Sequence, residues 1–270
     1  MKEITRYWLH SIEFDINSKC NLNCAYCAHF SNLNSEKEDL IYPLDQLEND
    51  MKRLSELFII STIKIVGGEP FLVDNLIDYV RVIVKYFPYS WVKVYTNNIL
   101  KTKINNFILD CNSDEKLKNV DVNLSHYPII KLGELSERHK IMEKPKFKFL
   151  NLNLKGDSDA HISRSKCFCY SCLSLRQGRI YICPITANLK HFLDYFNLNN
   201  SKMSLDLNEA SIDIYNNDSQ TILNFINGFD GGLKFCRYCQ PSHPLVEWKQ
   251  SEKTIEEYVD KDYEKRFKNK

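Results

Sequence analysis

The chain has 270 residues, of which 43% are hydrophobic, and this is enough for one large α/β domain with a small additional module. Lys and Arg number 36 against 35 Asp and Glu, so no net charge attracts a nucleic acid or an anionic membrane surface. The N-terminal residues lack the apolar core and cleavage site of a signal peptide, and no stretch approaches the roughly 20 apolar residues of a membrane span. We therefore expect a cytoplasmic protein with neither a nucleic acid nor a membrane as its partner.

Residues 8–154 alternate short β-rich runs with longer amphipathic segments, a pattern typical of repeated βα units around a parallel sheet. The expected strands are 8–16, 62–66, 91–96, 120–125 and 147–154, and the expected helices are 43–58, 75–87, 104–111 and 132–143. The fold class that follows is α/β, with a partial (β/α) barrel of about five to six parallel strands. Polar motifs follow four of these strands, so we expect them to gather at the carboxyl ends, where such sheets bind ligands.

After residue 155 the sequence changes to a polar, cysteine-rich connector. Residues 173–183 then predict a β-hairpin that turns at Gln177 and Gly178, and residues 219–228 predict a helix. The charged residues 251–270 suggest a helical tail in solvent. We therefore expect a barrel domain over 1–155 and a small cysteine-rich hairpin and helix domain over 156–270.

The chain contains ten cysteines, and in a chain of this length without a signal peptide they are more often metal ligands than disulfides. Two groups and one isolated residue are present: Cys20, Cys24 and Cys27; Cys167, Cys169, Cys172, Cys183, Cys236 and Cys239; and Cys111. Two metal sites in two regions are the simplest interpretation. Cys111 ends a helical run and is expected to be a buried thiol.

The first group lies within CNLNCAYC, residues 20–27, and three hypotheses apply to it: a zinc knuckle, a redox pair, or an iron-sulfur site. A structural zinc site needs four protein ligands, whereas this loop offers three. A cubane iron-sulfur cluster can be held by three thiolates, and its fourth iron is then open to an exogenous ligand.

This loop, with Tyr26 before its last cysteine, and GGEP at 67–70 together resemble the radical S-adenosylmethionine (radical SAM) superfamily. The resemblance implies a [4Fe-4S] cluster on the three cysteines, whose open iron is chelated by S-adenosylmethionine. It also implies a set of cofactor-binding residues: Tyr26, Gly67, Gly68, Glu69, Pro70, Asn97 and Ser125. Structural roles remain open alternatives, because Tyr26 can pack the loop, GGEP can form an ordinary turn, and Asn97 or Ser125 can cap one. The sequence TNN at 96–98 departs from the more frequent TNG of the family, which leaves the path of that loop open.

The reaction that the resemblance implies is a reductive cleavage of S-adenosylmethionine to a deoxyadenosyl radical, which abstracts hydrogen from a substrate. An external electron donor, such as flavodoxin or ferredoxin, is then the expected protein partner.

The second group has the spacing C-x10-G-x4-C followed by C-x2-C, through Cys167, Gly178, Cys183, Cys236 and Cys239. This resembles the twitch domain, a shortened SPASM extension that holds one auxiliary [4Fe-4S] cluster on four thiolates. Cys172 or Cys169 can take the place of Cys167, and a zinc site on the same four thiolates is an alternative. A full SPASM domain would need three more cysteines after Cys239, which the sequence does not contain.

The whole layout resembles short radical SAM dehydrogenases of the 2-deoxy-scyllo-inosamine dehydrogenase type. The leading hypothesis is a radical SAM oxidoreductase that oxidises a small polar substrate, such as a sugar, aminocyclitol or nucleotide-sugar, with the auxiliary cluster as electron acceptor. No catalytic residue is assigned, but Arg164, His161 and His126 are candidates for polar contacts or a base.

Two other hypotheses remain. The first is a peptide-modifying maturase or epimerase, although a first strand near residue 8 leaves no room for an N-terminal leader-peptide domain. The second is a non-catalytic iron-sulfur or zinc scaffold.

Overall fold

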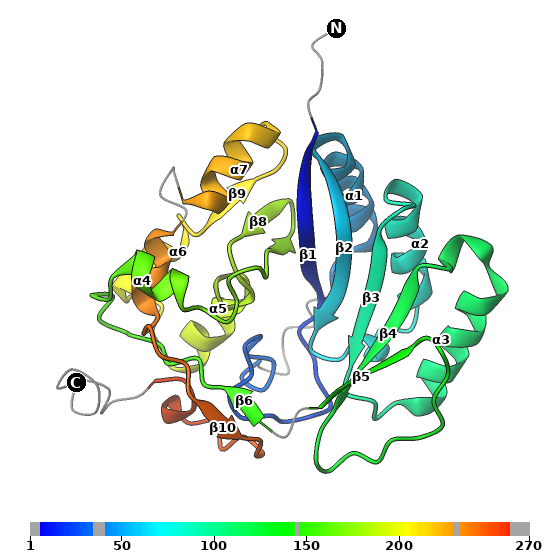
Figure 1. Cartoon of the computed structure of the whole chain (residues 1–270). Helices are drawn as coiled ribbons and strands as arrows, with labels where there is room; N and C mark the ends of the chain where they lie inside the picture. The colour runs from blue at the N-terminus through cyan, green and yellow to red at the C-terminus, as the bar shows by residue number, and fades with distance from the viewer. Residues whose placement is uncertain (1–5, 35–40, 144–145, 229–232, 260–270) are drawn as a thin grey trace, which may run out of the picture.

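The computed structural model describes residues 6–34, 41–143, 146–228 and 233–259. Its main feature is an eight-stranded sheet with the order β5-β4-β3-β2-β1-β7-β8-β9 (Figure 1). The strands are β1 (Tyr7–Asn17), β2 (Phe58–Gly67), β3 (Trp91–Thr96), β4 (Val120–His126), β5 (His139–Glu143), β7 (Ser174–Arg176), β8 (Arg179–Tyr181) and β9 (Ser211–Asp213). Neighbours from β5 to β7 pair in parallel, whereas β8 and β9 are antiparallel. The described sheet therefore has six parallel strands, in agreement with the expected partial barrel.

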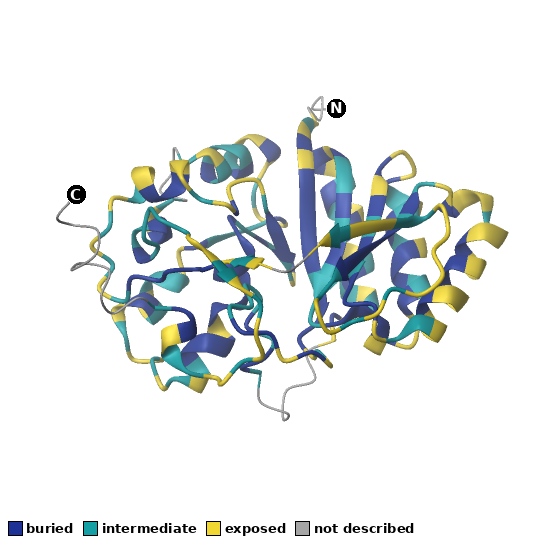
Figure 2. Cartoon of the chain, turned by 60° about the horizontal axis from the view of Figure 1, so that its bottom comes forward, coloured by how far each residue is buried: buried dark blue, intermediate teal, exposed yellow. Residues whose placement is uncertain are grey.

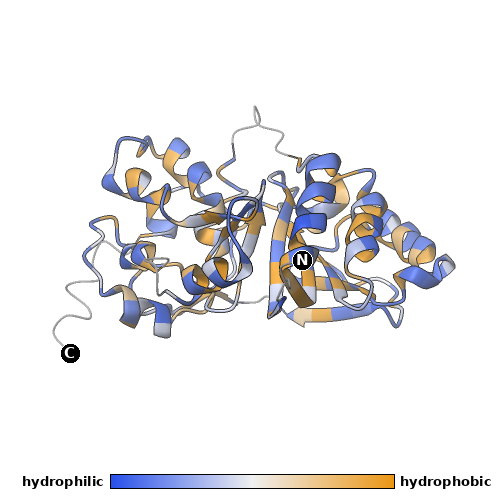
Figure 3. Ribbon diagram, turned by 90° about the horizontal axis from the view of Figure 1, so that it is seen from above, coloured by the Kyte–Doolittle hydropathy of each residue, from blue (hydrophilic) through white to orange (hydrophobic). Residues whose placement is uncertain are grey.

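Helices α1 (Leu44–Leu57), α2 (Leu76–Tyr86) and α3 (Lys101–Ser113) cover the outer face of the parallel strands (Figure 1). In α1 the buried residues Leu47, Met51 and Leu54 recur at helical spacing and pack on the sheet, which is why this segment forms an amphipathic helix. Figure 2 shows the same helices buried on the sheet side and exposed on the other, and Figure 3 shows their apolar and polar stripes.

The carboxyl ends of β1, β2 and β3 all point to one end of the molecule, the bottom of Figure 1. A second sheet crosses this end, formed by antiparallel pairing of β6 (Lys146–Lys148) with β10 (Leu245–Glu247). The mouth of the barrel is therefore bounded by residues about 100 positions apart in the sequence.

Two expected elements are wrong. Residues 132–143 do not form a helix, because Arg138 donates to the carbonyl oxygens of Leu117 (2.9 Å) and Val120 (2.7 Å) and holds the following residues extended as β5 beside β4. Residues 147–154 do not form the fifth strand of the main sheet. Only β6 is a strand there, and the residues after it enter a second apolar core.

The second half of the chain contains α4 (Ala160–Ser165), α5 (Pro184–Tyr195), α6 (Lys202–Leu207) and α7 (Ser219–Asn227). Single 3-10 turns are η1 (Pro70–Leu72), η2 (Glu115–Leu117), η3 (Lys234–Tyr238) and η4 (Ile255–Glu257). The expected helix at 219–228 is confirmed as α7, which Asp218 caps at the start and Gly228, with a φ of 84°, ends. The expected hairpin is confirmed as β7 and β8, and both turn residues have positive φ, 46° at Gln177 and 74° at Gly178.

A buried carboxylate joins the hairpin to the barrel. Asp50 of α1 has no exposed surface, and it accepts hydrogen bonds from the Gly178 amide at 2.9 Å, from the Tyr215 hydroxyl at 2.5 Å and from the Tyr42 hydroxyl. A buried carboxylate needs such donors to offset its lost hydration. The main sheet thus includes strands from both sides of residue 155. The expected domain boundary at that position stays a prediction.

The tail expected in solvent is wrong in part, because Glu257 and Tyr258 are buried in the second core region. The rest of that tail, from residue 260, lies outside the described residues. None of the described helices is long and apolar enough to cross a bilayer.

Candidate functional site

A cavity of about 370 Å³ lies at the carboxyl ends of the parallel strands. Its wall combines the cysteine loop, the ends of β2, β3 and β4, and the sheet of β6 and β10. The lining includes Cys20, Cys24, Tyr26, Cys27, His29, Ser31, Gly67, Gly68, Tyr95, Asn97, Ser125, Tyr127, Lys146, Phe147, Lys148, Phe168 and Leu245. Of the expected cofactor-binding residues, the structure brings Tyr26, Gly67, Gly68, Asn97 and Ser125 to this wall, but not Glu69 and Pro70.

The three thiols of the loop share this wall and interact electrostatically with one another. Burial raises the pKa of Cys20 and of Cys24 to about 12, so both bind a metal only with release of their protons. Among the described residues, no three His, Cys, Asp or Glu side chains are close enough to hold a single metal ion. An iron-sulfur cluster does not need its thiolates to meet at a single metal ion, because each thiolate binds a separate iron.

The donor set fits a cubane cluster with an open iron. The described chain places three cysteines on the cavity wall, and the rest of the cavity lies beside them. In addition, the Ser31 hydroxyl oxygen is buried at this wall and has no hydrogen-bond partner among the described residues. A buried polar atom of this kind indicates a missing partner.

The glycines of GGEP are needed because the cysteine loop passes directly over them. A Cβ at Gly68 would lie 1.7 Å from the Lys19 carbonyl oxygen, and one at Gly67, whose φ is 123°, would lie 2.4 Å from the Asn17 carbonyl oxygen. Backbone hydrogen bonds from Gly68 to Asn17 (2.9 Å) and from Glu69 to Lys19 (2.7 Å) join the two segments. The turn therefore fixes the base of the cysteine loop and leaves one face of the glycines to the cavity.

Glu69 holds the next loop in place. Its carboxylate accepts hydrogen bonds from the Thr96 hydroxyl (2.7 Å), the Asn97 amide (2.8 Å) and the Phe71 amide (3.1 Å). Burial raises its pKa, although these donors oppose the shift. Two of these donors belong to TNN, and the third is the amide of the residue after GGEP, so Glu69 positions the loop after β3.

The loop at 96–98 has a backbone conformation that glycine adopts easily. Asn98 has a φ of 63°, a left-handed conformation that asparagine tolerates better than most residues. The neighbouring Asn97 side chain donates to the Asn21 side-chain oxygen at 2.7 Å and to the Cys20 sulfur at 3.8 Å. TNN therefore replaces TNG without moving Asn97 away from the cysteine loop.

Tyr26 is also left-handed, with a φ of 63°. Its ring contacts Phe149 edge-on, with centroids 5.8 Å apart, and the Lys249 ammonium lies 5.9 Å from the ring centroid. Because Tyr26 both packs and lines the cavity, the packing role and a cofactor contact are compatible.

Sequence reasoning assigned no role to two residues beside the thiols. Tyr127 is close to all three thiols, and its pKa lies well above its ordinary value because of burial and then of the charges on Cys24, Cys27 and Cys20. Trp248 donates from Nε1 to the Cys24 sulfur at 3.2 Å. Tyr127 follows the strand expected at 120–125 and has a local signal in the sequence SHY at 125–127, whereas Trp248 is 224 positions from Cys24 and has none.

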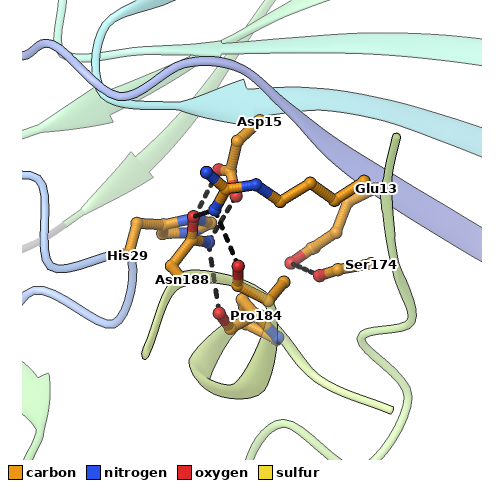
Figure 4. Close-up of polar contacts among 8 residues, drawn as sticks. Glu13, Asp15, His29, Ser174, Pro184 and Asn188 are labelled. Atoms are coloured by element: carbon orange, nitrogen blue, oxygen red, sulfur yellow. Dashed lines mark hydrogen bonds and ion pairs between the residues drawn. The ribbon is translucent and has the colours of Figure 1, made fainter. Parts of the chain in front are cut away.

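A charged group lies beside the cavity on the inner side of β1 (Figure 4). The His29 Nδ1 is 2.6 Å from the Asp15 carboxylate, which also accepts from Asn188. Burial disfavours the charge on His29, but Asp15 outweighs it and raises the histidine pKa to about 10. Glu13 has a pKa of about 7 because of burial, and the one hydrogen bond drawn to it comes from Ser174 at 3.5 Å.

The second group of cysteines gathers in the other half of the molecule. Cys239 interacts electrostatically with Cys183, Cys236 and Cys167, and burial raises its pKa well above the ordinary value. Cys169 donates its amide to the Cys167 sulfur at 3.3 Å. Cys172 interacts with Cys169 and Cys167 as well, but it also interacts with Lys64, His29 and Glu13 of the barrel.

The candidate polar residues named from the sequence do not line the cavity. His126 pairs with Glu143 at 2.9 Å, and His161 is exposed on α4. Arg164 is buried and donates to the Tyr170 carbonyl oxygen at 2.6 Å. The histidine that lines the cavity is His29. Cys111 is buried, as expected.

Comparison with known proteins places part of the chain in a family. Residues 15–128 match the model of the radical SAM superfamily. The protein named "Probable GTP 3',8-cyclase" of Methanococcus aeolicus is 31% identical over 123 residues, which cover 45% of this chain and 40% of that protein. A GTP 3',8-cyclase of Lactiplantibacillus plantarum is 26% identical over 165 residues, 56% of this chain and 48% of the relative. The chain thus spans less than half the length of these cyclases.

Among solved structures, BtrN in complex with AdoMet and 2-DOIA matches with a TM-score of 0.51 and 18% identity, over 86% of this chain and 93% of that chain. This likeness shows a shared fold. The family model independently identifies residues 15–128 as similar to the radical SAM superfamily, which implies a [4Fe-4S] cluster and S-adenosylmethionine as cofactors of this part of the chain.

Proposed function

We propose that the protein is a radical SAM oxidoreductase that oxidises a small polar molecule, such as a sugar, aminocyclitol or nucleotide-sugar, and that its second cysteine group holds an auxiliary [4Fe-4S] cluster. The observation that supports this most is that one cavity joins three thiols, a glycine turn and a polar wall from the second half of the chain. When bound, the reduced cluster supplies one electron for the reductive cleavage of S-adenosylmethionine.

In this proposal Cys20, Cys24 and Cys27 hold the cluster, and the Gly67 and Gly68 backbone binds the methionine part of the cofactor. Asn97 and Ser125 contact its carboxylate and ribose, and Tyr26 lies near its adenine. Each of these residues lines the same cavity. Tyr127 and Trp248 cover the thiols from the side and exclude water from them.

The polar side chains of the wall suit a substrate rich in oxygen atoms. Lys148 of β6 offers an ammonium donor, the Lys146 ammonium is paired with Glu247 at 3.1 Å, and His29 offers a ring held by Asp15. Such donors bind hydroxyl or phosphate oxygens. A substrate bound between them and the cysteine loop would lie close to the cofactor.

The auxiliary site is supported by the approach of its loop to the cavity. Phe168, between Cys167 and Cys169, lines the cavity wall, so the loop that carries these two cysteines reaches the cavity. Cys167, Cys183, Cys236 and Cys239 provide four thiolates that would hold a closed cluster. Such a cluster would accept the second electron of an alcohol oxidation, because the first leaves with the hydrogen atom that the deoxyadenosyl radical takes and the remaining proton passes to a base. We propose Cys167 as the ligand ahead of Cys169 and Cys172, because its charge acts on Cys183, Cys236 and Cys239 together.

The test is to incubate anaerobically reconstituted protein with a reductant, S-adenosylmethionine and a panel of sugars, aminocyclitols and nucleotide-sugars. We expect 5'-deoxyadenosine and an oxidised product in a ratio of about one to one, because each oxidation consumes one cofactor. Cleavage of S-adenosylmethionine without any oxidised product across the panel would contradict the oxidoreductase proposal but not the radical SAM assignment.

A second candidate is a redox-neutral rearrangement of a nucleotide, which the curated relatives named GTP 3',8-cyclases favour. Inclusion of GTP in the panel separates the two. A cyclised nucleotide with no change in oxidation state would support this candidate.

A further inference from the structure

The C-terminal part of the chain forms a strap, residues 248–258, that is attached to the cysteine loop. Cys24 and Gln250 form an antiparallel bridge. The Ala25 amide donates to the Lys249 carbonyl oxygen at 3.0 Å, and the Ser251 amide donates to the Asn23 carbonyl oxygen at 2.9 Å. The middle of the cysteine loop therefore depends on the strap for its backbone hydrogen bonds.

The far end of the strap is anchored below the same loop. The Asn32 side chain donates to the Ser251 hydroxyl at 2.8 Å and accepts from the Tyr258 hydroxyl at 2.8 Å. The Ser251 hydroxyl in turn donates to Glu257 at 2.6 Å. Both Glu257 and Tyr258 are almost fully buried, so these contacts are shielded from water and hold the strap in one position.

Trp248 begins the strap and is the residue that touches a thiol. Its indole Nε1 donates to the Cys24 sulfur at 3.2 Å, and its ring packs on Tyr127, with centroids 6.1 Å apart. The indole N–H is a donor only, so it stabilises a thiolate whose negative charge is larger. Reduction adds negative charge to a cluster and its sulfur ligands, and hydrogen bonds to those sulfurs are known to tune cluster potentials.

We propose that Trp248 is a positioning residue that favours the reduced state of the first cluster by its hydrogen bond to Cys24, and that the strap keeps this donor in place. The inference rests on the proposed role of Cys24 as a cluster ligand. It adds a residue from the second half of the chain to a site built from the first half.

The test is Trp248→Phe, which keeps an aromatic ring and removes the N–H. Trp91→Phe is the matched control, because Trp91 is about half exposed on β3 and does not line the cavity. Iron content is measured first, and then the midpoint potential of the cluster whose EPR signal changes when S-adenosylmethionine is added. We expect the ratio of reduced to oxidised cluster at a fixed potential to fall about fivefold in Trp248→Phe and to stay unchanged in Trp91→Phe.

If Trp248→Phe loads less iron than the wild type, a second variant with a benzothiophene ring in place of the Trp248 indole preserves the shape and removes only the N–H. The same fivefold fall in that variant supports the proposal. A potential equal to that of the wild type, at full iron content, overturns it. Absence of iron on the first site in the wild type as well would instead defeat the assignment of Cys24, which separates the two failures.

Discussion

The two cysteine regions of this molecule differ in what surrounds their sulfur atoms. Cys20, Cys24 and Cys27 stand on the wall of a cavity and have glycines and asparagines opposite them. Cys183, Cys236 and Cys239 are surrounded by the second apolar core, and none of them lines that cavity. Thiols beside a space suit a site that binds an exogenous ligand, and thiols within a core suit a closed site that only carries electrons.

The largest expected effect separates these two roles. Cys24→Ala is expected to remove about four of roughly eight irons per chain and to abolish S-adenosylmethionine cleavage, because the open site loses one of its three ligands. Cys236→Ala is expected to remove the same amount of iron but to leave reductive cleavage of S-adenosylmethionine in place. Iron analysis and deoxyadenosine production by chromatography check both variants. If Cys24→Ala still cleaves S-adenosylmethionine, the roles assigned to the two cysteine groups are wrong or reversed.

The next largest effect is expected for Gly68→Ala. The added Cβ would meet the Lys19 carbonyl oxygen at 1.7 Å, so the cysteine loop must move. We expect a loss of about 3 kcal/mol in the free energy of unfolding, together with weaker binding of S-adenosylmethionine. Gly133→Ala is the control, since a Cβ there is 3.4 Å from the flexible Lys101 side chain. Urea unfolding of both variants measures the difference, and equal stability would show that the close approach is absent.

Glu13, between the two regions, gives a smaller effect that depends on pH. Burial raises its pKa from 4.5 to about 7, so the folded state holds the proton more tightly than the unfolded chain does. The resulting stabilisation is complete below pH 4.5 and is lost as the pH rises to about 7. The glutamine of Glu13→Gln does not titrate, so the variant does not lose this stabilisation. The free energy of unfolding of the variant relative to the wild type should therefore rise by about 2–3 kcal/mol from pH 5 to pH 8. Urea unfolding at both pH values tests this, and a constant difference would contradict it.

The smallest effect on iron content is expected for Cys172→Ser, because Cys172 also interacts with His29 and Lys64 of the barrel. Cys172→Ser should retain full iron content, whereas Cys167→Ser should lose the auxiliary cluster. If Cys172→Ser loses the iron and Cys167→Ser does not, the assignment of the ligands is reversed.

Much of the barrel could be predicted from the sequence because its signals are local. The strand at 91–96 has the expected bounds, and α1 and α2 lie within one residue of theirs, since apolar periodicity and Pro88 mark them. The Gln177 and Gly178 turn could likewise be predicted from its own residues.

The errors come from contacts between distant segments. Arg138 binds carbonyl groups 18 and 21 positions earlier and makes a strand where the local pattern favours a helix. The same limit applies to the site. The motifs identify the thiols and glycines, but Trp248 reaches Cys24 through pairing between distant segments, β10 with β6 and Gln250 with Cys24.

The most direct test of the account is EPR spectroscopy of the reduced Cys236→Ala variant, in which only the first cluster is expected to remain. We predict that addition of S-adenosylmethionine changes the spectrum of that cluster, because the cavity beside Cys20, Cys24 and Cys27 lets the cofactor reach an iron without a protein ligand. A loaded cluster whose spectrum does not respond to saturating S-adenosylmethionine would contradict the central claim.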